Sequence, residues 1–230
     1  MGAARVICLN PSRRRPMKLY YYDHCPFSAR VRMALNLKAI EAERVVLPAD
    51  DEQTLVGLIG KHQIPVLVRD DGTPMADSTD IVRYLDALDG RPTIREPDTP
   101  ALHRWLEPFV PNLQYLGYPR WTRIGLEEFA SPSAYAHFRE KKTETIGDFD
   151  EALANTDAKA REVEEQLARL PDILDLTPTH DHPRWDDITL FPMLRSLSVV
   201  EAIDWPQAVR AYVVTQAERS GLDTFFDRAL

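Results

Sequence analysis

Two sequence patterns divide this chain, and the division restricts the folds it can adopt. Before residue 90, short aromatic or β-branched runs alternate with stretches of helical periodicity, whereas only helical periodicity follows residue 100. Strands are expected at 18–22, 44–47, 64–68 and 74–76, and helices at 26–40, 53–59 and 78–88. This layout predicts one small sheet in the first third of the chain and no strand in the remainder.

The first part of the chain therefore has the order β-α-β-α-β-β-α. Because a helix joins the first two strands, we expect them to run parallel with a right-handed crossover. The turn Asp70-Asp71-Gly72 joins the last two strands as a hairpin. This is the element order of thioredoxin-like domains, so residues 17–89 are predicted to form an α/β thioredoxin-like N-terminal domain.

A linker and a helical domain are expected to follow. Residues 90–100 hold three prolines among polar side chains, a composition typical of linkers. The later helices are expected at 101–116, 132–153, 158–170, 187–200 and 206–219. Pro108 and Pro111 predict a kink in the first of them. Residues 101–230 are therefore predicted to be an all-α C-terminal domain.

Composition excludes several kinds of site and partner. The 230 residues carry 28 Lys and Arg against 36 Asp and Glu, a formal net charge of −8. Neither nucleic acid nor an anionic membrane surface is therefore an expected partner. Two cysteines cannot supply a disulfide framework or a four-thiolate zinc site. His180 and His182 stand in a loop rich in Pro and Thr and are expected to be solvated, so no metal is predicted.

Residues 1–16 have the character of a disordered tail, or of a stretch upstream of a true start at Met17 rather than Met1. Cys8 lies in this stretch. The apolar patch within residues 1–16 is too short for a secretory signal, and it stands before the arginines rather than after them. No run approaches the roughly 18–20 consecutive apolar residues of a membrane span. Together with the low cysteine count, this predicts a cytoplasmic location.

Cys25 is the candidate nucleophile. It stands where the first strand ends and the helix opened by Pro26 begins. Free backbone N–H groups and the positive end of the helix dipole favour thiolate over thiol there, so the pKa of Cys25 is expected to fall. His24 is expected to add positive potential unless it points into solvent. Ser28 is expected either to hydrogen-bond the thiolate or to bond nearby backbone.

Two further positions complete a candidate binding site. If the Ile64-Pro65 bond is cis, the Ile64 backbone can pair with an extended peptide; the alternative is an ordinary strand-start proline. Asp77 and Ser78 open the next helix, where N–H groups can bind a carboxylate and Asp77 an ammonium; the alternative is simple N-capping. A small thiol peptide with an α-amino acid end fits these pieces and Cys25, and glutathione is such a peptide.

Longer motifs resemble a known family. They are Tyr-Asp-His-Cys-Pro-Phe-Ser at 22–28, Gln-Ile-Pro-Val-Leu at 63–67, Ala-Asp-Ser-Thr-Asp-Ile-Val at 76–82, and the segments around 185–197 and 205–206. These are similar to the bacterial glutaredoxin-2 family, and the resemblance covers nearly all of the chain from Met17. It implies the glutathione S-transferase architecture and glutathione as co-substrate. Phe27 and His62 join Ile64, Pro65, Asp77 and Ser78 in the expected glutathione-binding set.

The sequence departs from this family at two positions. Ser28 stands where the family usually carries a second cysteine, and an alcohol cannot attack a mixed disulfide. A monothiol route is therefore expected, in which Cys25 takes glutathione from a glutathionylated thiol and a second glutathione releases it. Arg184 replaces the Ser or Thr that often stands three residues before the aspartate of the buried helix. The capping box with Asp187 is therefore in doubt.

Other functions stay open at this point. The Cys-Pro-Phe-Ser quartet at 25–28 also resembles omega-type glutathione transferases and dehydroascorbate reductases, which use one cysteine in the same way. A non-catalytic glutathione-binding interaction protein is a third possibility, although such a scaffold would have no physical need for all three pieces of the site. The expected partners are glutathione and glutathionylated thiols, and the choice between monomer and homodimer stays open.

Overall fold

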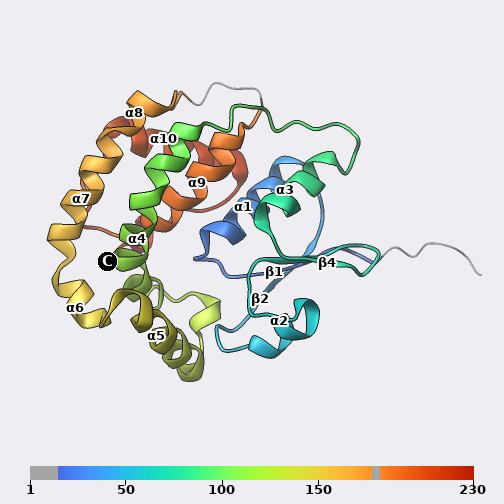
Figure 1. Cartoon of the computed structure of the whole chain (residues 1–230), viewed down its shortest axis with the longest axis horizontal. Helices are drawn as coiled ribbons and strands as arrows, with labels where there is room; N and C mark the ends of the chain where they lie inside the picture. The colour runs from blue at the N-terminus through green and yellow to red at the C-terminus, as the bar shows by residue number, and fades with distance from the viewer. Residues whose placement is uncertain (1–14, 178–181) are drawn as a thin grey trace, which may run out of the picture.

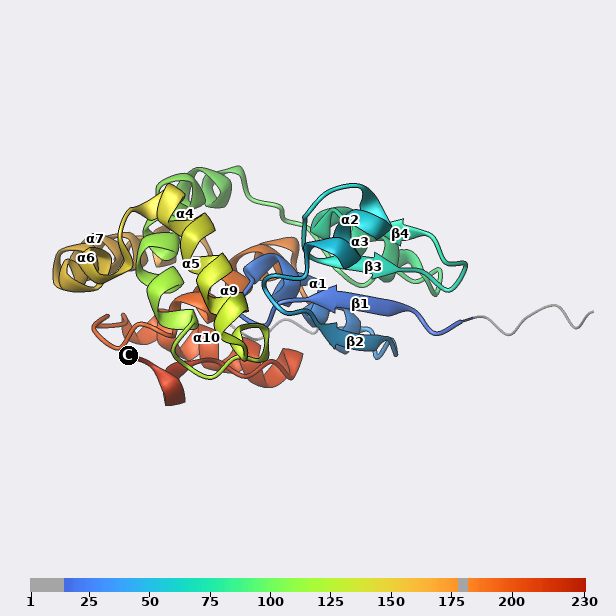
Figure 2. The same cartoon turned by 90° about the horizontal axis from the view of Figure 1, so that it is seen from below.

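The computed structural model describes residues 15–177 and 182–230. The expectations for Cys8, for His180 and for most of residues 1–16 lie outside these ranges. The described chain forms a four-stranded sheet and a set of helices gathered beside it (Figures 1 and 2). None of the helices in the described ranges is long and apolar enough to cross a membrane.

The sheet has the strand order β2-β1-β3-β4. Its strands are β1 (Lys18–Tyr21), β2 (Glu43–Val46), β3 (Val66–Val68) and β4 (Pro74–Met75). β1 and β2 run parallel, whereas β3 pairs antiparallel with both β1 and β4. This confirms the predicted parallel pair and the predicted hairpin. Among the described residues no β-strand follows β4.

Alternation along β1 explains how the sheet is covered. Leu19 and Tyr21 pack into the large core together with α1 (Pro26–Leu37) and α3 (Ser78–Ala87). Tyr20 and the adjacent Tyr22 belong instead to a second cluster, which contains Leu55 of α2 (Glu52–Ile59). Because successive side chains of a strand point to opposite faces, this pattern places α1 and α3 on one face and α2 on the other (Figure 1).

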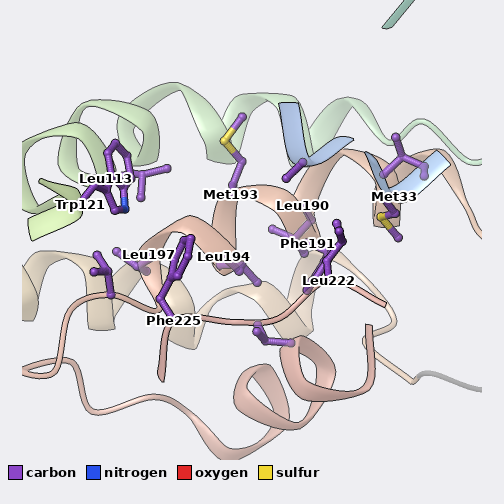
Figure 3. Close-up of a cluster of buried hydrophobic side chains, with 14 of the residues drawn as sticks. Met33, Leu113, Trp121, Leu190, Phe191, Met193, Leu194, Leu197, Leu222 and Phe225 are labelled. Carbon is purple, nitrogen blue, oxygen red and sulfur yellow. The ribbon is translucent and has the colours of Figure 1, made fainter. Parts of the chain in front are cut away.

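The second part of the chain is helical. Its helices are α4 (Pro100–Trp121), α5 (Pro132–Ile146), α6 (Phe149–Ala154), α7 (Thr156–Ala168), α8 (Leu170–Ile173), α9 (Trp185–Leu197) and α10 (Gln207–Ser220), with 3-10 turns at Glu127–Phe129 and Phe226–Arg228. α9 is buried at every position from Asp186 to Leu197. It supplies Leu190, Phe191, Met193, Leu194 and Leu197 to the cluster in Figure 3. α1 packs against both α9 and α10, so the helical part is joined to the sheet through α1.

Two helices differ from their predicted bounds. α4 contains Pro108 and Pro111 and extends to Trp121, beyond the predicted end at 116. The carbonyls that these prolines leave without an N–H partner belong to Arg104 and Glu107, which are exposed, so water can bond them. The single helix expected over 132–153 is two helices instead.

The break between α5 and α6 has a local cause. Gly147 has a φ of 81°, a conformation that favours glycine. Asp148 then caps α6, because its carboxylate accepts hydrogen bonds from the backbone N–H groups of Asp150 and Glu151. Gly147 therefore ends α5, and Asp148 begins α6.

Arg184 leaves half of the questioned capping box in place. The Asp187 carboxylate accepts the Arg184 backbone N–H at 3.1 Å, as a capping-box aspartate does. The Arg184 guanidinium cannot accept a hydrogen bond in return, and it donates to the same carboxylate instead. Tyr212 of α10 also donates to Asp187, which fixes the start of α9 to its neighbour.

Candidate active site

Cys25 occupies the N-cap of α1, immediately before Pro26. Its backbone is extended, and its carbonyl accepts the first helical hydrogen bond from Ala29 at 2.9 Å. Cys25 is partly exposed and lines a cavity of about 500 Å³. The structure therefore places the sulfur at a helix start, as the sequence predicted, and opens it to a space large enough for a small ligand.

Two parts of the molecule form the walls of this cavity. One wall comes from the sheet part of the chain and is made by Tyr22, His24, Cys25, Pro26, Phe27, Ala49, His62, Gln63 and Ile64. The other comes from the helical part and is made by Val110, Gln114, Tyr118, Trp121, His137, Phe138, Lys141, Lys142 and Met193. Gly117 makes room for this wall, because a Cβ there would lie 2.5 Å from the Trp121 ring. Cys25, Phe27, His62 and Ile64 thus meet at one cavity.

The remaining predicted binding residues lie beside the cavity. The Ile64-Pro65 bond is cis, and Pro65 precedes β3. Gln63 donates from Nε2 to the Ala76 carbonyl at 2.8 Å, which ties this turn to the segment before α3. Asp77 and Ser78 start α3 but do not line the cavity.

Asp77 and Ser78 both have local hydrogen bonds. The exposed Asp77 carboxylate accepts from the Thr79 and Asp80 N–H groups, so the capping role is confirmed. Ser78 is buried, and its hydroxyl lies 3.5 Å from Nη1 of Arg30, which also donates to the Thr79 hydroxyl. Because Arg30 belongs to α1, it connects the helix of Cys25 to the start of α3.

The electrostatics at Cys25 correct one expectation. Burial raises the pKa of the Cys25 thiol, while hydrogen bonds from Ser28 and from the Phe27 N–H lower it, and the net pKa lies above the ordinary value. The direction is opposite to the predicted fall, because burial of the sulfur outweighs the hydrogen bonds that favour the thiolate. Ser28 is fully buried, and its hydroxyl also accepts the Tyr22 N–H at 3.4 Å.

His62 is one of the expected glutathione-binding residues, and it lines the cavity. Burial lowers the pKa of His62, and the Lys141 and Lys142 charges oppose protonation, although Glu52 favours it. The ring is therefore neutral at physiological pH. Its Nε2 lies 3.3 Å from the Tyr22 hydroxyl. His62 can thus offer a hydrogen bond to a ligand rather than a charge.

The turn before Cys25 is held by residues distant in the sequence. His24 is buried, so it does not point into solvent. Its backbone N–H and Nδ1 lie 3.0 and 2.7 Å from Oε1 of Glu128, and its carbonyl accepts the Ser196 hydroxyl at 2.8 Å. Arg195 donates to the Asp23 carbonyl at 2.7 Å and to its carboxylate at 2.8 Å. We call Asp23, His24, Glu128, Arg195 and Ser196 the turn clamp.

Sequence analysis missed the helical wall and the turn clamp. Lys141 and Lys142 carry no motif, and Glu128 is a single acidic residue in a short turn, so no local pattern identified them. Their roles come from tertiary packing alone. Among the described residues, no group of three or more His, Cys, Asp or Glu side chains is arranged to hold a metal ion.

Comparison with known proteins identifies the family. The sequence model described as glutaredoxin 2, C-terminal domain, matches residues 101–229, and the model described as glutathione S-transferase, N-terminal domain, matches residues 24–88. Glutaredoxin 2 of Escherichia coli strain K12 is 36% identical over 216 residues, covering 93% of this chain and 100% of the relative. The chain belongs to the glutaredoxin 2 family. The resemblance noted in the sequence is thereby confirmed, and the chain is an enzyme of the glutathione oxidoreductase and transferase group.

Solved structures agree with this membership. The crystal structure of glutaredoxin 2 from Salmonella typhimurium, which is in complex with glutathione, superposes with a TM-score of 0.88. The two sequences are 37% identical, and the match covers 94% of this chain and 100% of that one. Gtt2 from Saccharomyces cerevisiae, at 22% identity and a TM-score of 0.59, shows the shared fold alone. The chain described here therefore has the predicted glutathione S-transferase fold.

Proposed function

We propose that this enzyme is a glutathione-dependent thiol-disulfide oxidoreductase that works by a monothiol mechanism. One observation carries the proposal: Cys25 opens into the cavity, and the residue one helical turn later is Ser28 rather than a second thiol. In the described part of the chain, Cys25 is the sole cysteine. An internal disulfide therefore has no second sulfur there. The natural substrates are mixed disulfides between glutathione and other thiols.

Glutathione is proposed to lie along the wall formed by the sheet part of the chain. Its sulfur would meet Cys25, its cysteinyl backbone would pair with Ile64, and Phe27 and His62 would contact its remaining atoms. Asp77 would bind its ammonium group. Because the Asp77 carboxylate already takes the Thr79 and Asp80 N–H groups, the α-carboxylate is left to Ser78 and to Arg30 beside it. The glutathione complex of the Salmonella relative supports this choice of ligand.

The proposed reaction has two exchange steps. The Cys25 thiolate attacks the glutathione sulfur of a mixed disulfide, so a Cys25–glutathione disulfide forms while the bond to the substrate sulfur breaks. The substrate leaves as a thiolate and takes a proton from water. A glutathione thiolate then attacks the bound glutathione sulfur, releasing oxidised glutathione and restoring the Cys25 thiolate. A thiolate of higher pKa is less abundant but more nucleophilic, so the raised pKa of Cys25 is compatible with the first step.

The nucleophile can be tested directly. Cys25→Ser should reduce turnover of a glutathionylated peptide at least a thousandfold, because serine is not ionised at neutral pH. This loss corresponds to an activation free energy that is higher by about 4 kcal/mol or more. Mass spectrometry of the wild type should show one glutathione on Cys25 after single turnover. Activity close to the wild type in Cys25→Ser would end the proposal. The control is Ser133→Ala, an exposed hydroxyl on α5.

The monothiol part has its own test. Ser28→Cys should gain the ability to reduce a protein disulfide, because a second thiol can then resolve the mixed intermediate. The measurement is insulin disulfide reduction beside deglutathionylation, in both the wild type and the variant. Disulfide reduction by the wild type as fast as by Ser28→Cys would contradict the monothiol mechanism.

Dehydroascorbate reduction is the alternative activity of the same cysteine. Comparison of kcat/KM for a glutathionylated peptide and for dehydroascorbate separates the two functions, and we expect the peptide to be preferred. A non-catalytic binding protein would bind glutathione and turn over neither substrate. Because the first exchange step regenerates a free thiol, we also place the enzyme in a reducing compartment, the cytoplasm.

A further inference from the structure

The helical wall of the cavity is basic although the chain as a whole is acidic. α5 presents His137, Phe138, Lys141 and Lys142 to the cavity, at the spacing that places residues on one helix face. Among the described residues that line the cavity there is no Asp or Glu, whereas the whole sequence has a formal net charge of −8. The positive charge is therefore a local property of this cavity wall.

The two lysines are available to a ligand. Lys142 holds its ammonium 5.2 Å from the centre of the Tyr118 ring and 5.7 Å from that of Phe138, so stacking on the aromatic wall positions it. In the described ranges no carboxylate lies within 4.0 Å of either the Lys141 or the Lys142 ammonium, whereas three other lysines have one. Those pairs are Lys18 with Glu43, Lys38 with Asp86 and Asp89, and Lys159 with Glu162.

One acidic residue lies at this end of the cavity. The Glu52 carboxylate is 3.4 Å from Nε2 of His137 and 3.9 Å from Nδ1 of His62, so it faces the two histidines. Tyr118 lines the same cavity as Cys25. Burial and then the Cys25 charge raise the pKa of Tyr118 to about 12, so its hydroxyl remains a neutral donor.

We propose that this basic wall binds an anionic group on the substrate thiol that is released when Cys25 attacks the glutathione sulfur. The inference rests on the proposed function, in which glutathione occupies the opposite wall and the departing substrate faces α5. The preferred substrates are then glutathionylated cysteines with Asp or Glu beside them, because a carboxylate next to the sulfur reaches Lys141 and Lys142. Opposite charges brought together in a cavity also increase the encounter rate.

The test compares two glutathionylated peptides that are identical except for Glu or Lys on both sides of the cysteine. At low ionic strength kcat/KM should favour the Glu peptide about tenfold, near threefold per lysine, and the preference should shrink as salt screens the charges. The Lys141→Gln/Lys142→Gln variant should lose the preference, and Lys141→Glu/Lys142→Glu should reverse it. The matched control Lys159→Gln/Arg161→Gln makes the same change in net charge away from the cavity and should keep it.

The outcomes separate this inference from the proposed function. Equal kcat/KM for the two peptides would overturn the basic-wall inference while leaving Cys25 chemistry intact, because both peptides would still be turned over. No turnover of either peptide would reject the proposed function itself. If the lysines instead held the carboxylate of glutathione, the KM for glutathione would rise equally for every substrate in the double Gln variant, and that result would also overturn the inference.

Discussion

Ser28 shows how a single side chain adjusts the nucleophile. Its hydroxyl and N–H lower the pKa of Cys25 against the burial that raises it. Ser28→Ala removes the hydroxyl and should move the pKa of Cys25 upward by up to about one unit, the equivalent of one hydrogen bond of about 1 kcal/mol. The midpoint of iodoacetamide alkylation against pH measures this shift, and alkylation at pH 7 should slow by up to about tenfold.

Alkylation also distinguishes this role from simple packing. Ser28 is fully buried, so its loss could disturb α1 rather than the thiolate. Disturbance would expose Cys25 and accelerate alkylation at every pH, whereas loss of the hydrogen bond slows it below the pKa only. A midpoint equal to that of the wild type would show that the hydroxyl does not act on the sulfur. Cys25→Ser provides the blank for the reagent.

For single residues, the sequence predicted the position in a helix or strand well, but it predicted the surrounding side chains poorly. The end of β1 and the proline at 26 were enough to place Cys25 at a helix start. Its pKa was predicted in the wrong direction, because the burial that raises it depends on the tertiary structure, which no local pattern shows. His24 contacts Glu128 across 104 residues of sequence, and no feature of the sequence around either residue predicts this contact.

Whole elements were predictable where a local signal both starts and stops them. α3 has its Asp77 cap and an apolar face of Ile81, Val82 and Leu85, and it begins at the predicted residue. The α5–α6 boundary was missed although Gly147 and Asp148 supply both signals, because the periodicity continues across them. For α4, the periodic apolar residues were followed only to 116, whereas the helix continues to Trp121.

Which neighbour a helix meets was not predictable from periodicity. The spacing of apolar residues identifies the face of a helix that is buried, but it does not say what covers that face. α5 has a weak apolar stripe, with Ala134 and Phe138 as its buried residues. The same helix nevertheless lines the cavity with His137, Phe138, Lys141 and Lys142, a contact that its sequence pattern does not indicate.

At the scale of the molecule, the turn clamp connects the two halves of the chain at the active site. Glu128 lies in the helical part, and His24 and Cys25 lie in the sheet part, so a change in their relative position would move the nucleophile. Arg195 is almost completely buried, and its partner Asp23 also forms an ion pair with Arg32. Removing one member of a buried ion pair costs about 3–5 kcal/mol because the other charge is left uncompensated. The clamp therefore contributes both to the stability of the whole protein and to the geometry of its site.

The clamp should make the protein sensitive to acid. Burial alone would raise the pKa of Glu128, but the hydrogen bonds from His24 outweigh it, and the net pKa lies below the ordinary value of 4.5. Asp23 behaves in the same way through Arg195 and Arg32. The folded state therefore binds fewer protons than the unfolded chain near pH 4. The stabilisation is present in full above pH 4.5 and is lost as the pH falls through the lowered values.

Glu128→Gln tests this linkage, because glutamine keeps the shape and an acceptor oxygen but cannot titrate. At pH 7 the variant should be less stable than the wild type by about 1–3 kcal/mol, the cost of weakening a buried charged hydrogen bond. As the pH falls below 4.5, its urea midpoint, followed by tryptophan fluorescence, should fall less than that of the wild type. Titration of Asp23 accounts for the pH dependence that remains in the variant. The exposed Glu127→Gln is the matched control and should follow the wild type. Equal pH slopes for Glu128→Gln and the wild type would mean that Glu128 carries no more negative charge in the folded than in the unfolded protein, so the clamp would hold the active-site turn through hydrogen bonds and packing alone.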